Sequence, residues 1–164
     1  MPVLYAGDSL GCALGETVFH DLPDDPTLPA EIFRADLLTL RAGFFTVTRA
    51  ITVVDLIDPA LTTLNLNRDD VIDTPPVEYP TAATWGQAAW DATKAQGIVW
   101  NSRRSHGQLS YVLFVDPSRP ADRSRAVHRN RDLQVTQPPL PLHDGNGLGH
   151  VLTAASADDV TVIF

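Results

Sequence analysis

The sequence predicts a single α+β domain, and three features of the 164-residue chain carry that prediction. β-Branched and aromatic residues dominate residues 44–56, as is typical of strands. Residues 81–97 form the clearest helical pattern, and two short apolar runs follow them, at 98–102 and 109–116. Mixed elements in this order favour an α+β fold, and the chain length suits one core spanning residues 1–164.

The N-terminal region is predicted to form a strand followed by a helix. The strand covers residues 3–5 and the helix residues 9–20, with Asp8 or Ser9 as the N-cap. A loop punctuated by prolines follows at residues 21–29.

The middle of the chain is predicted to be richer in strand. We expect two β segments, with Gly43 as the break between them. A short helix is expected at residues 58–66, with Asp58 as its cap and Pro59 at its first position. Residues 68–80 are expected to be irregular.

The helix at residues 81–97 has clear predicted ends. Thr81 supplies the N-terminal cap, and Gly97 occupies the C′ position just beyond the last turn. The two apolar strands that follow are joined by a polar turn at residues 103–108.

The C-terminal tail combines several weaker signals. We expect a strand at residues 132–136, a proline cluster at 138–141, a helix near 148–156 and a last strand at 160–164. The sequence HDGNGLGH, residues 143–150, has only loose dinucleotide-type glycine spacing and does not sit inside a βαβ unit. We therefore interpret it as a loop.

Composition limits the classes of function. The net charge of -8 argues against a general nucleic-acid or anionic-membrane surface. No run approaches the roughly 18 apolar residues of a membrane span, and no signal-peptide pattern opens the chain. The single cysteine, Cys12, excludes an internal disulfide. We expect a cytoplasmic protein.

Basic residues gather in one part of this acidic chain. Seven of the twelve lie within residues 103–131, so a local anion site and a solvated basic face are both open interpretations. They are Arg103, Arg104, Arg119, Arg123, Arg125, Arg129 and Arg131.

Two groups of polar residues are candidates for chemistry. Glu16 and His20 lie one helical turn apart, which fits either a site or a solvated face. The other histidines form no ligand pattern, so we expect no metal; they are His106, His128, His143 and His150.

The second group is the turn at residues 102–106. Guanidinium groups of Arg103 and Arg104 beside serine hydroxyls suit a phosphate or diphosphate, although the turn could equally face water. A hydrolase trio of Ser102, His106 and Asp116 lacks the G-x-S-x-G elbow, and we set it aside.

Four segments, in order, resemble the RES domain, a family named for Arg, Glu and Ser. They are LYAGDSLGCALGETVFHD, VVDL, TWGQAAWDATKAQ and GIVWNSRRSHGQLSYVLF. The first resembles the family's tyrosine strand and the helix carrying its glutamate and histidine, and the last resembles its G-[IL]-x-[YW]-x-S signature. The resemblance covers about residues 3–115.

This resemblance implies a fold similar to ADP-ribosyltransferases, with a mixed sheet and flanking helices. It implies a bacterial toxin of a toxin–antitoxin pair that consumes NAD as its substrate. The nicotinamide–ribose bond is cleaved and the ADP-ribosyl group passes to water, phosphate or a protein. The implied partner is an Xre-like helix-turn-helix antitoxin, with no direct contact to nucleic acid or membrane.

The resemblance also assigns roles to residues. Glu16 would hold the ribose hydroxyls and stabilise positive charge on the ribose. Tyr5 would stack on nicotinamide, and His20 would orient Glu16 or the ligand. Ser102 would donate a hydrogen bond to nicotinamide or phosphate.

Arg104, with Arg103 beside it, is a weaker match to a diphosphate clamp. The family's arginine lies upstream of the tyrosine, and here only residues 1–4 precede Tyr5. We therefore expect that arginine and the first strand to be absent. An active enzyme and a non-catalytic protein that binds a nucleotide or an antitoxin remain alternatives, and an uncovered strand edge would favour a homo-oligomer.

Overall fold

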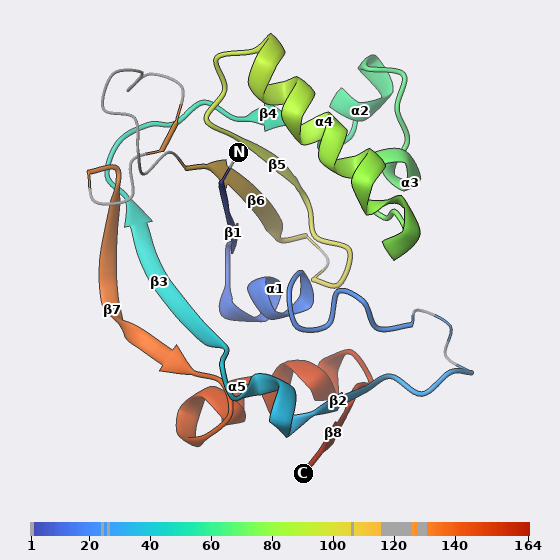
Figure 1. The fold of residues 1–164 in the computed structure, drawn as a ribbon, viewed down its shortest axis with the longest axis vertical. Coiled ribbons are helices and arrows are strands. Elements are labelled where there is room, and N and C mark those ends of the chain that lie inside the picture. The colour runs from blue at the N-terminus through green and yellow to red at the C-terminus, as the bar shows by residue number, and fades with distance from the viewer. Residues whose placement is uncertain (1, 24, 26, 106, 116–125, 128–130) are drawn as a thin grey trace.

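The computed structural model describes residues 2–23, 25, 27–105, 107–115, 126–127 and 131–164 (Figure 1). Its elements confirm the α+β class. In chain order they are β1 (Val3–Gly7), α1 (Leu10–Gly15), β2 (Glu31–Phe33), the 3-10 turn η1 (Arg34–Leu37), β3 (Arg41–Val47), β4 (Val54–Asp55), α2 (Ala60–Thr63), α3 (Arg68–Val71), the 3-10 turn η2 (Pro76–Glu78), α4 (Tyr79–Ala92), β5 (Gly97–Asn101), β6 (Leu109–Phe114), β7 (Leu133–Pro141), α5 (Gly145–Ala157) and β8 (Thr161–Ile163).

A four-stranded mixed sheet lies at the centre, in the order β1-β6-β5-β4. β4 runs parallel to β5, and the other neighbours are antiparallel. The buried start of β5 requires a glycine, because a Cβ on Gly97 would lie 2.4 Å from the carbonyl oxygen of Val112. Tyr5, Val112 and Ile98 occupy matched positions on the three adjacent strands, so their side chains share one face of the sheet.

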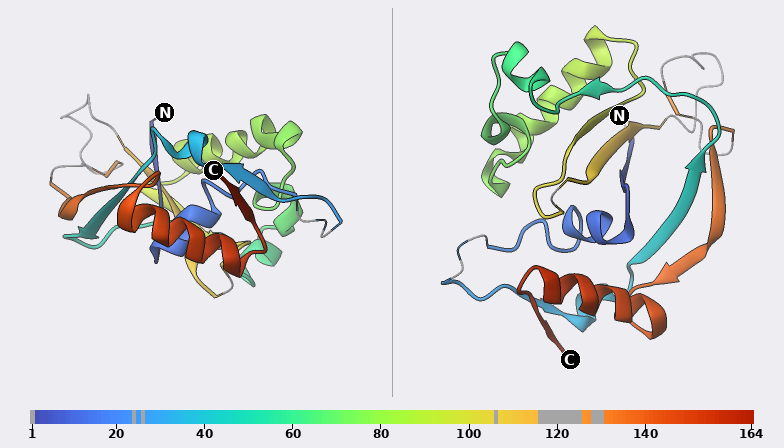
Figure 2. Two further views of the ribbon diagram at one scale, coloured as in Figure 1. Left: turned by 90° about the horizontal axis from the view of Figure 1, so that it is seen from below. Right: turned by 180° about the vertical axis from the view of Figure 1, so that it is seen from behind.

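Two smaller pairs of strands flank this sheet. β3 and β7 form an antiparallel ribbon with register shifts, and β2 pairs in parallel with β8 (Figures 1 and 2). α5 follows β7 and packs against α1, burying Leu14, Phe19 and Val151 in one apolar cluster. Because α1 directly follows β1, this cluster fixes the end of β1 against the C-terminal part of the fold.

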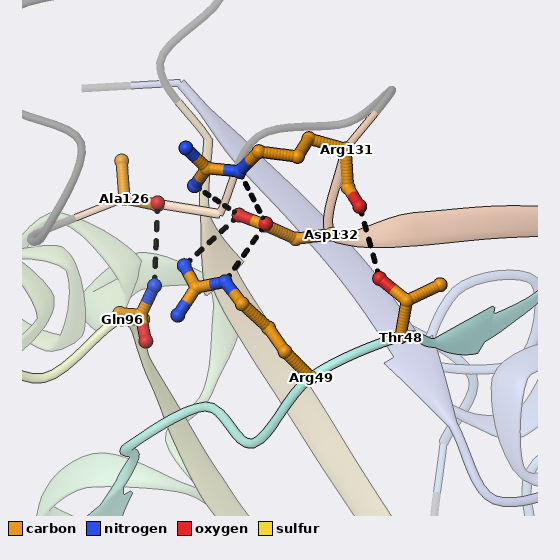
Figure 3. A network of polar contacts seen from close by, with 6 residues as sticks. All are labelled: Thr48, Arg49, Gln96, Ala126, Arg131 and Asp132. Atoms are coloured by element: carbon orange, nitrogen blue, oxygen red, sulfur yellow. Dashed lines mark hydrogen bonds and ion pairs between the residues drawn. The ribbon is translucent and has the colours of Figure 1, made fainter.

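A buried carboxylate ties the ribbon together. Asp132 is fully buried, and the guanidinium groups of Arg49 and Arg131 each donate two hydrogen bonds to it, at 2.7–3.0 Å (Figure 3). Nearby, the Gln96 amide donates to the carbonyl of Ala126 at 3.3 Å. These contacts join the end of β3 and the start of β7 beside the central sheet.

The N-terminal strand and the Ser9 cap are confirmed, but the first helix is shorter than predicted. It ends at Gly15 rather than continuing to residue 20, and Glu16 is its C-cap residue. Phe19 instead turns into the cluster with α5, where it is fully buried. Tertiary burial of this ring therefore ends the helix early, and Glu16 and His20 do not share a helix face.

Three boundaries in the middle of the chain also differ from prediction. Gly43 lies inside β3 at a register shift, so it does not break the strand. α2 begins after Pro59, which itself occupies the cap position, so Asp58 is not the cap. The stretch predicted to be irregular contains α3 and η2.

The prediction for the 81–97 helix was wrong at both ends. α4 begins at Tyr79, with Pro80 in its first turn, so Thr81 is not its cap. It ends at Ala92, and Gly97 begins β5 instead of closing the helix. The chain needs the residues between Ala92 and Gly97 to pass from the helix into the sheet.

In the tail, the proline cluster forms the end of β7, at the exposed margin of the ribbon, instead of a separate segment. The predicted helix near 148–156 is confirmed, but α5 begins earlier, so residues 145–150 of the predicted loop are helical. Gly147 has a packing reason, since a Cβ there would lie 1.7 Å from the carbonyl oxygen of Pro141. The last strand is confirmed as β8.

The Asp132 cluster generates a stability prediction. Asp132→Asn should lower the free energy of unfolding by about 3 kcal/mol, because two guanidinium groups lose their common carboxylate. This value is at the low end for breaking a buried ion pair, because both arginine side chains are partly exposed to water. Urea denaturation measures this. Arg49→Gln should cost less than Asp132→Asn, since Arg131 still neutralises the carboxylate; equal stability of Asp132→Asn and the parent protein would contradict the prediction.

Candidate active site

A cavity of about 740 Å³ lies between one face of the central sheet and helix α4. Its volume is in the range of small-molecule sites. β1 and β5 contribute Tyr5 and Trp100, the chain after α1 contributes Glu16 and His20, and α4 contributes Tyr79 and Trp85. Five aromatic side chains and one carboxylate therefore converge on a largely apolar space.

Glu16 is held in place by three donors from the segment that ends β5. The Ser102 hydroxyl donates to Glu16 Oε1 at 2.7 Å, and the backbone N–H of Arg103 donates to the same oxygen at 3.1 Å. The indole N–H of Trp100 donates to Oε2 at 3.3 Å. These bonds span 84 to 87 residues of sequence and lock the carboxylate across the end of α1.

This pattern leaves the two oxygens unequal. From the described residues, Oε1 accepts two hydrogen bonds and Oε2 accepts one. Because each carboxylate oxygen has two acceptor positions, Oε2 keeps one for a ligand hydroxyl. The Ser102 hydroxyl accepts the N–H of Ser105 at 3.0 Å, which directs its own proton to Glu16. Ser102 is 4% exposed and supports Glu16 from behind the cavity wall.

Sequence reasoning placed Trp100 in the strand but assigned it no part in the site. The signal that could have found it is the alternation of β5. Trp100 lies two residues from Ile98 and two from Ser102, so a strand that presents Ile98 to the cavity also presents Trp100.

His20 also lines this cavity, but from the turn after α1 and not from the predicted helix. Its ring lies against that of Tyr79, with centroids 5.3 Å apart, instead of contacting Glu16 along a helix. The Tyr79 hydroxyl donates a hydrogen bond to Asp21. Burial raises the pKa of Tyr79 to about 12, with the hydrogen bond and the charge of Asp21 adding to it and Arg103 opposing it. Tyr79 was not among the predicted site residues.

Tyr5 lines the cavity from the edge strand and remains 57% exposed. Its ring is therefore available to a ligand. The structure thus brings Tyr5, Glu16 and His20 to one cavity, with Glu16 and His20 contributed by the chain after α1 and not by one helix.

Arg103 and Arg104 lie outside the residues that line this cavity. The Arg104 guanidinium donates to the carbonyl of Leu22, which anchors the chain after α1. Arg103 contributes its backbone N–H to Glu16, and its positive charge acts on the nearby Tyr79 hydroxyl.

Several sequence candidates lie outside the described residues: His106, Asp116, Arg119, Arg123, Arg125, His128 and Arg129. Within the described part of the chain, no group of three or more His, Cys, Asp or Glu side chains could hold a metal ion. Every helix in that part is too short or too polar for a membrane span.

The Tyr79 environment generates a pH prediction. The neutral phenol should persist to about pH 12, because burial and Asp21 both disfavour the phenolate. The contribution of this shift to stability is complete below pH 10, the ordinary pKa, and is lost as the pH rises through about 12. The difference in phenolate absorbance between the parent protein and Tyr79→Phe, read just after a pH jump, measures the midpoint. Asp21→Asn should lower it, and a parent midpoint near 10 would refute the prediction.

Comparison with known proteins identifies the family. The model of the family described as "RES domain" matches residues 1–143 of the 164. No curated protein and no solved structure matches the chain. The match covers most of the sequence, including every residue that places Glu16 in the cavity, and the protein therefore belongs to the RES domain family.

Proposed function

We propose that this protein cleaves the bond between nicotinamide and ribose in NAD. The observation that carries the proposal is a single carboxylate, Glu16, held by three donors in an aromatic cavity with one oxygen still able to accept a ligand hydroxyl. Cleavage of this bond develops positive charge on the ribose, and a fixed carboxylate stabilises such charge.

The aromatic walls suit the planar ends of this substrate. Tyr5 and Trp100 lie on the sheet side of the cavity, while Tyr79 and Trp85 lie on the α4 side. A nicotinamide ring between such walls gains stacking contacts and loses water. In this arrangement the ribose lies beside Glu16 Oε2, and nicotinamide leaves as the bond breaks.

Charge at the cavity decides where the diphosphate can lie. The described lining contains no arginine or lysine. We place the diphosphate at the rim, where Arg103 lies close enough to act on Tyr79. The same absence favours a second candidate, a non-catalytic domain that binds a nucleotide or a partner, because a diphosphate without a buried cation is held weakly.

Membership of the family extends the proposal beyond the chemistry. We propose that the protein is the toxin of a bacterial toxin–antitoxin pair, acts in the cytoplasm and is restrained by an Xre-like helix-turn-helix antitoxin. Water, phosphate or a protein side chain can accept the ADP-ribosyl group, and assay with and without phosphate separates the first two.

Glu16→Gln tests the enzyme directly. It should lower the rate of NAD loss at least about 100-fold, because glutamine keeps the shape but not the negative charge. Glu31→Gln is the matched control, since Glu31 is an exposed carboxylate on β2 outside the cavity. Chromatographic measurement of nicotinamide release gives both rates. If the folded parent binds NAD without releasing nicotinamide, the non-catalytic candidate holds.

Trp100→Phe tests whether the rate depends on the orientation of the Glu16 carboxylate. Loss of the N–H should lower kcat about tenfold, because this group donates to Glu16. KM should change less, because the phenyl ring of the variant keeps an aromatic face at the cavity wall. Trp90→Phe, which removes an indole that packs on Phe114 away from Glu16, controls for lost packing. An equal loss of kcat in both variants would contradict a positioning role for Trp100.

A further inference from the structure

A second large cavity lies on the other side of β1. It has a volume of about 850 Å³ and runs between β1 and β3, which stand apart in both views of the fold (Figures 1 and 2). Consecutive residues line it on both sides, 5–9 from β1 and the turn that follows it, and 41–45 from β3. We call this space the β1–β3 groove. Nothing in the proposed NAD chemistry uses it.

The register of β1 directs backbone groups into the groove. Val115 donates to the carbonyl of Pro2, and Asp8 donates to that of Leu109, so even-numbered residues of β1 bond to β6. The N–H and C=O groups of Tyr5 and Gly7 therefore point away from β6, toward the groove.

β3 presents the matching edge. Leu142 donates to the carbonyl of Leu40, and Thr48 donates to that of Asp132. Alternate residues of an antiparallel strand bond to its partner, and Leu40 and Thr48 both bond on the β7 side. With the register shifts taken into account, the backbone groups of Arg41, Phe45 and Val47 therefore point away from β7. Among the described residues, neither this edge nor that of β1 pairs with another strand.

β1 itself lacks several of the features that block strand addition. β1 reads VLYAG, without proline, lysine or a bulge. Its neighbours in the groove are apolar and aromatic, including Phe44, Tyr111 and Leu113. An uncovered edge of this kind binds an extended segment readily, because its backbone hydrogen bonds require no particular sequence.

Charge indicates which segment fits. Arg41 and Arg49 line the groove, and Arg49 shares the single carboxylate of Asp132 with Arg131. In the described lining of the groove the acid is Asp8, which accepts bonds from the Leu109 N–H and the Tyr111 hydroxyl. This described lining therefore carries more basic than acidic side chains, on a protein whose net charge is -8.

We propose that the β1–β3 groove binds an extended, acidic segment of a partner protein as an added β-strand. The strand inserts between β1 and β3 and bonds to both, with apolar side chains on Phe44 and Tyr111 and a carboxylate at Arg41. Because the Tyr5 backbone faces the groove and its side chain faces the NAD cavity, the added strand lies directly beside the proposed site.

Selection of random peptides of about ten residues, the length of a long strand, against the folded protein tests this proposal. Enriched sequences should alternate apolar residues and carry acids. Hydrogen exchange with the bound peptide should slow at the amides of Tyr5, Gly7, Arg41, Phe45 and Val47.

Charge variants give the matched control. Arg41→Glu should weaken the selected peptide at least about tenfold, whereas Lys94→Glu, the same charge change outside the groove, should alter the affinity by less than about twofold. N-methylation at odd or at even peptide residues should each weaken binding at least about tenfold, because the inserted strand bonds on both sides.

Three outcomes would overturn the proposal: no enrichment, enrichment of basic peptides, or slowed exchange only away from β1 and β3. Concentration-dependent protection of the β1 amides in the free protein, with a dimer in sedimentation, would show instead that a second copy covers the edge. If only one of the two N-methylated series binds more weakly, the peptide bonds to one strand edge alone and does not insert between β1 and β3.

Discussion

The hydrogen bonds to the Glu16 carboxylate join the parts of this protein that matter for function. They connect the end of α1 to the end of β5 through Trp100, Ser102 and Arg103. A charged acceptor makes these bonds stronger than neutral ones, and their donors come from an ordered strand end. These bonds fix the position of the carboxylate in the cavity and the direction of Oε2, the oxygen that can accept a further hydrogen bond.

Charge is divided between two regions of the fold. The cavity beside α4 holds one carboxylate among aromatic rings, with no arginine or lysine in its described lining. Guanidinium groups gather instead around Asp132, where Arg49 and Arg131 join β3 to the start of β7. The guanidinium groups therefore stabilise the ribbon, and the described lining of the cavity carries the negative charge of Glu16.

β1 connects the two cavities of the molecule. Its Tyr5 side chain lines the site, while its outward backbone groups line the β1–β3 groove. A strand that covers this edge would restrain Tyr5 without touching Glu16. An edge position thus allows a partner to influence the site through the backbone of a single strand.

Much of the fold could be predicted from local pattern, because strand composition and helix caps are properties of neighbouring residues. The strands after α4 and the Ser9 cap are examples. The errors came where distant packing outweighed local preference. Burial of Phe19 ends α1 early, and a glycine-rich stretch is helical where Gly147 packs directly on the backbone of Pro141.

The sequence by itself determined the α+β class, the family and the identity of Tyr5, Glu16, His20 and Ser102 as residues to examine. Only the tertiary structure decided what they do together. Glu16 and Ser102 are 86 residues apart, and a contact of 2.7 Å between them depends on how α1 packs beside β1 and β6. The alternation of β5 could have placed Trp100 at the cavity, but its bond to Glu16 depends on the tertiary structure. Tyr79 joins the site through a ring contact with His20, which leaves no periodic signal along the chain.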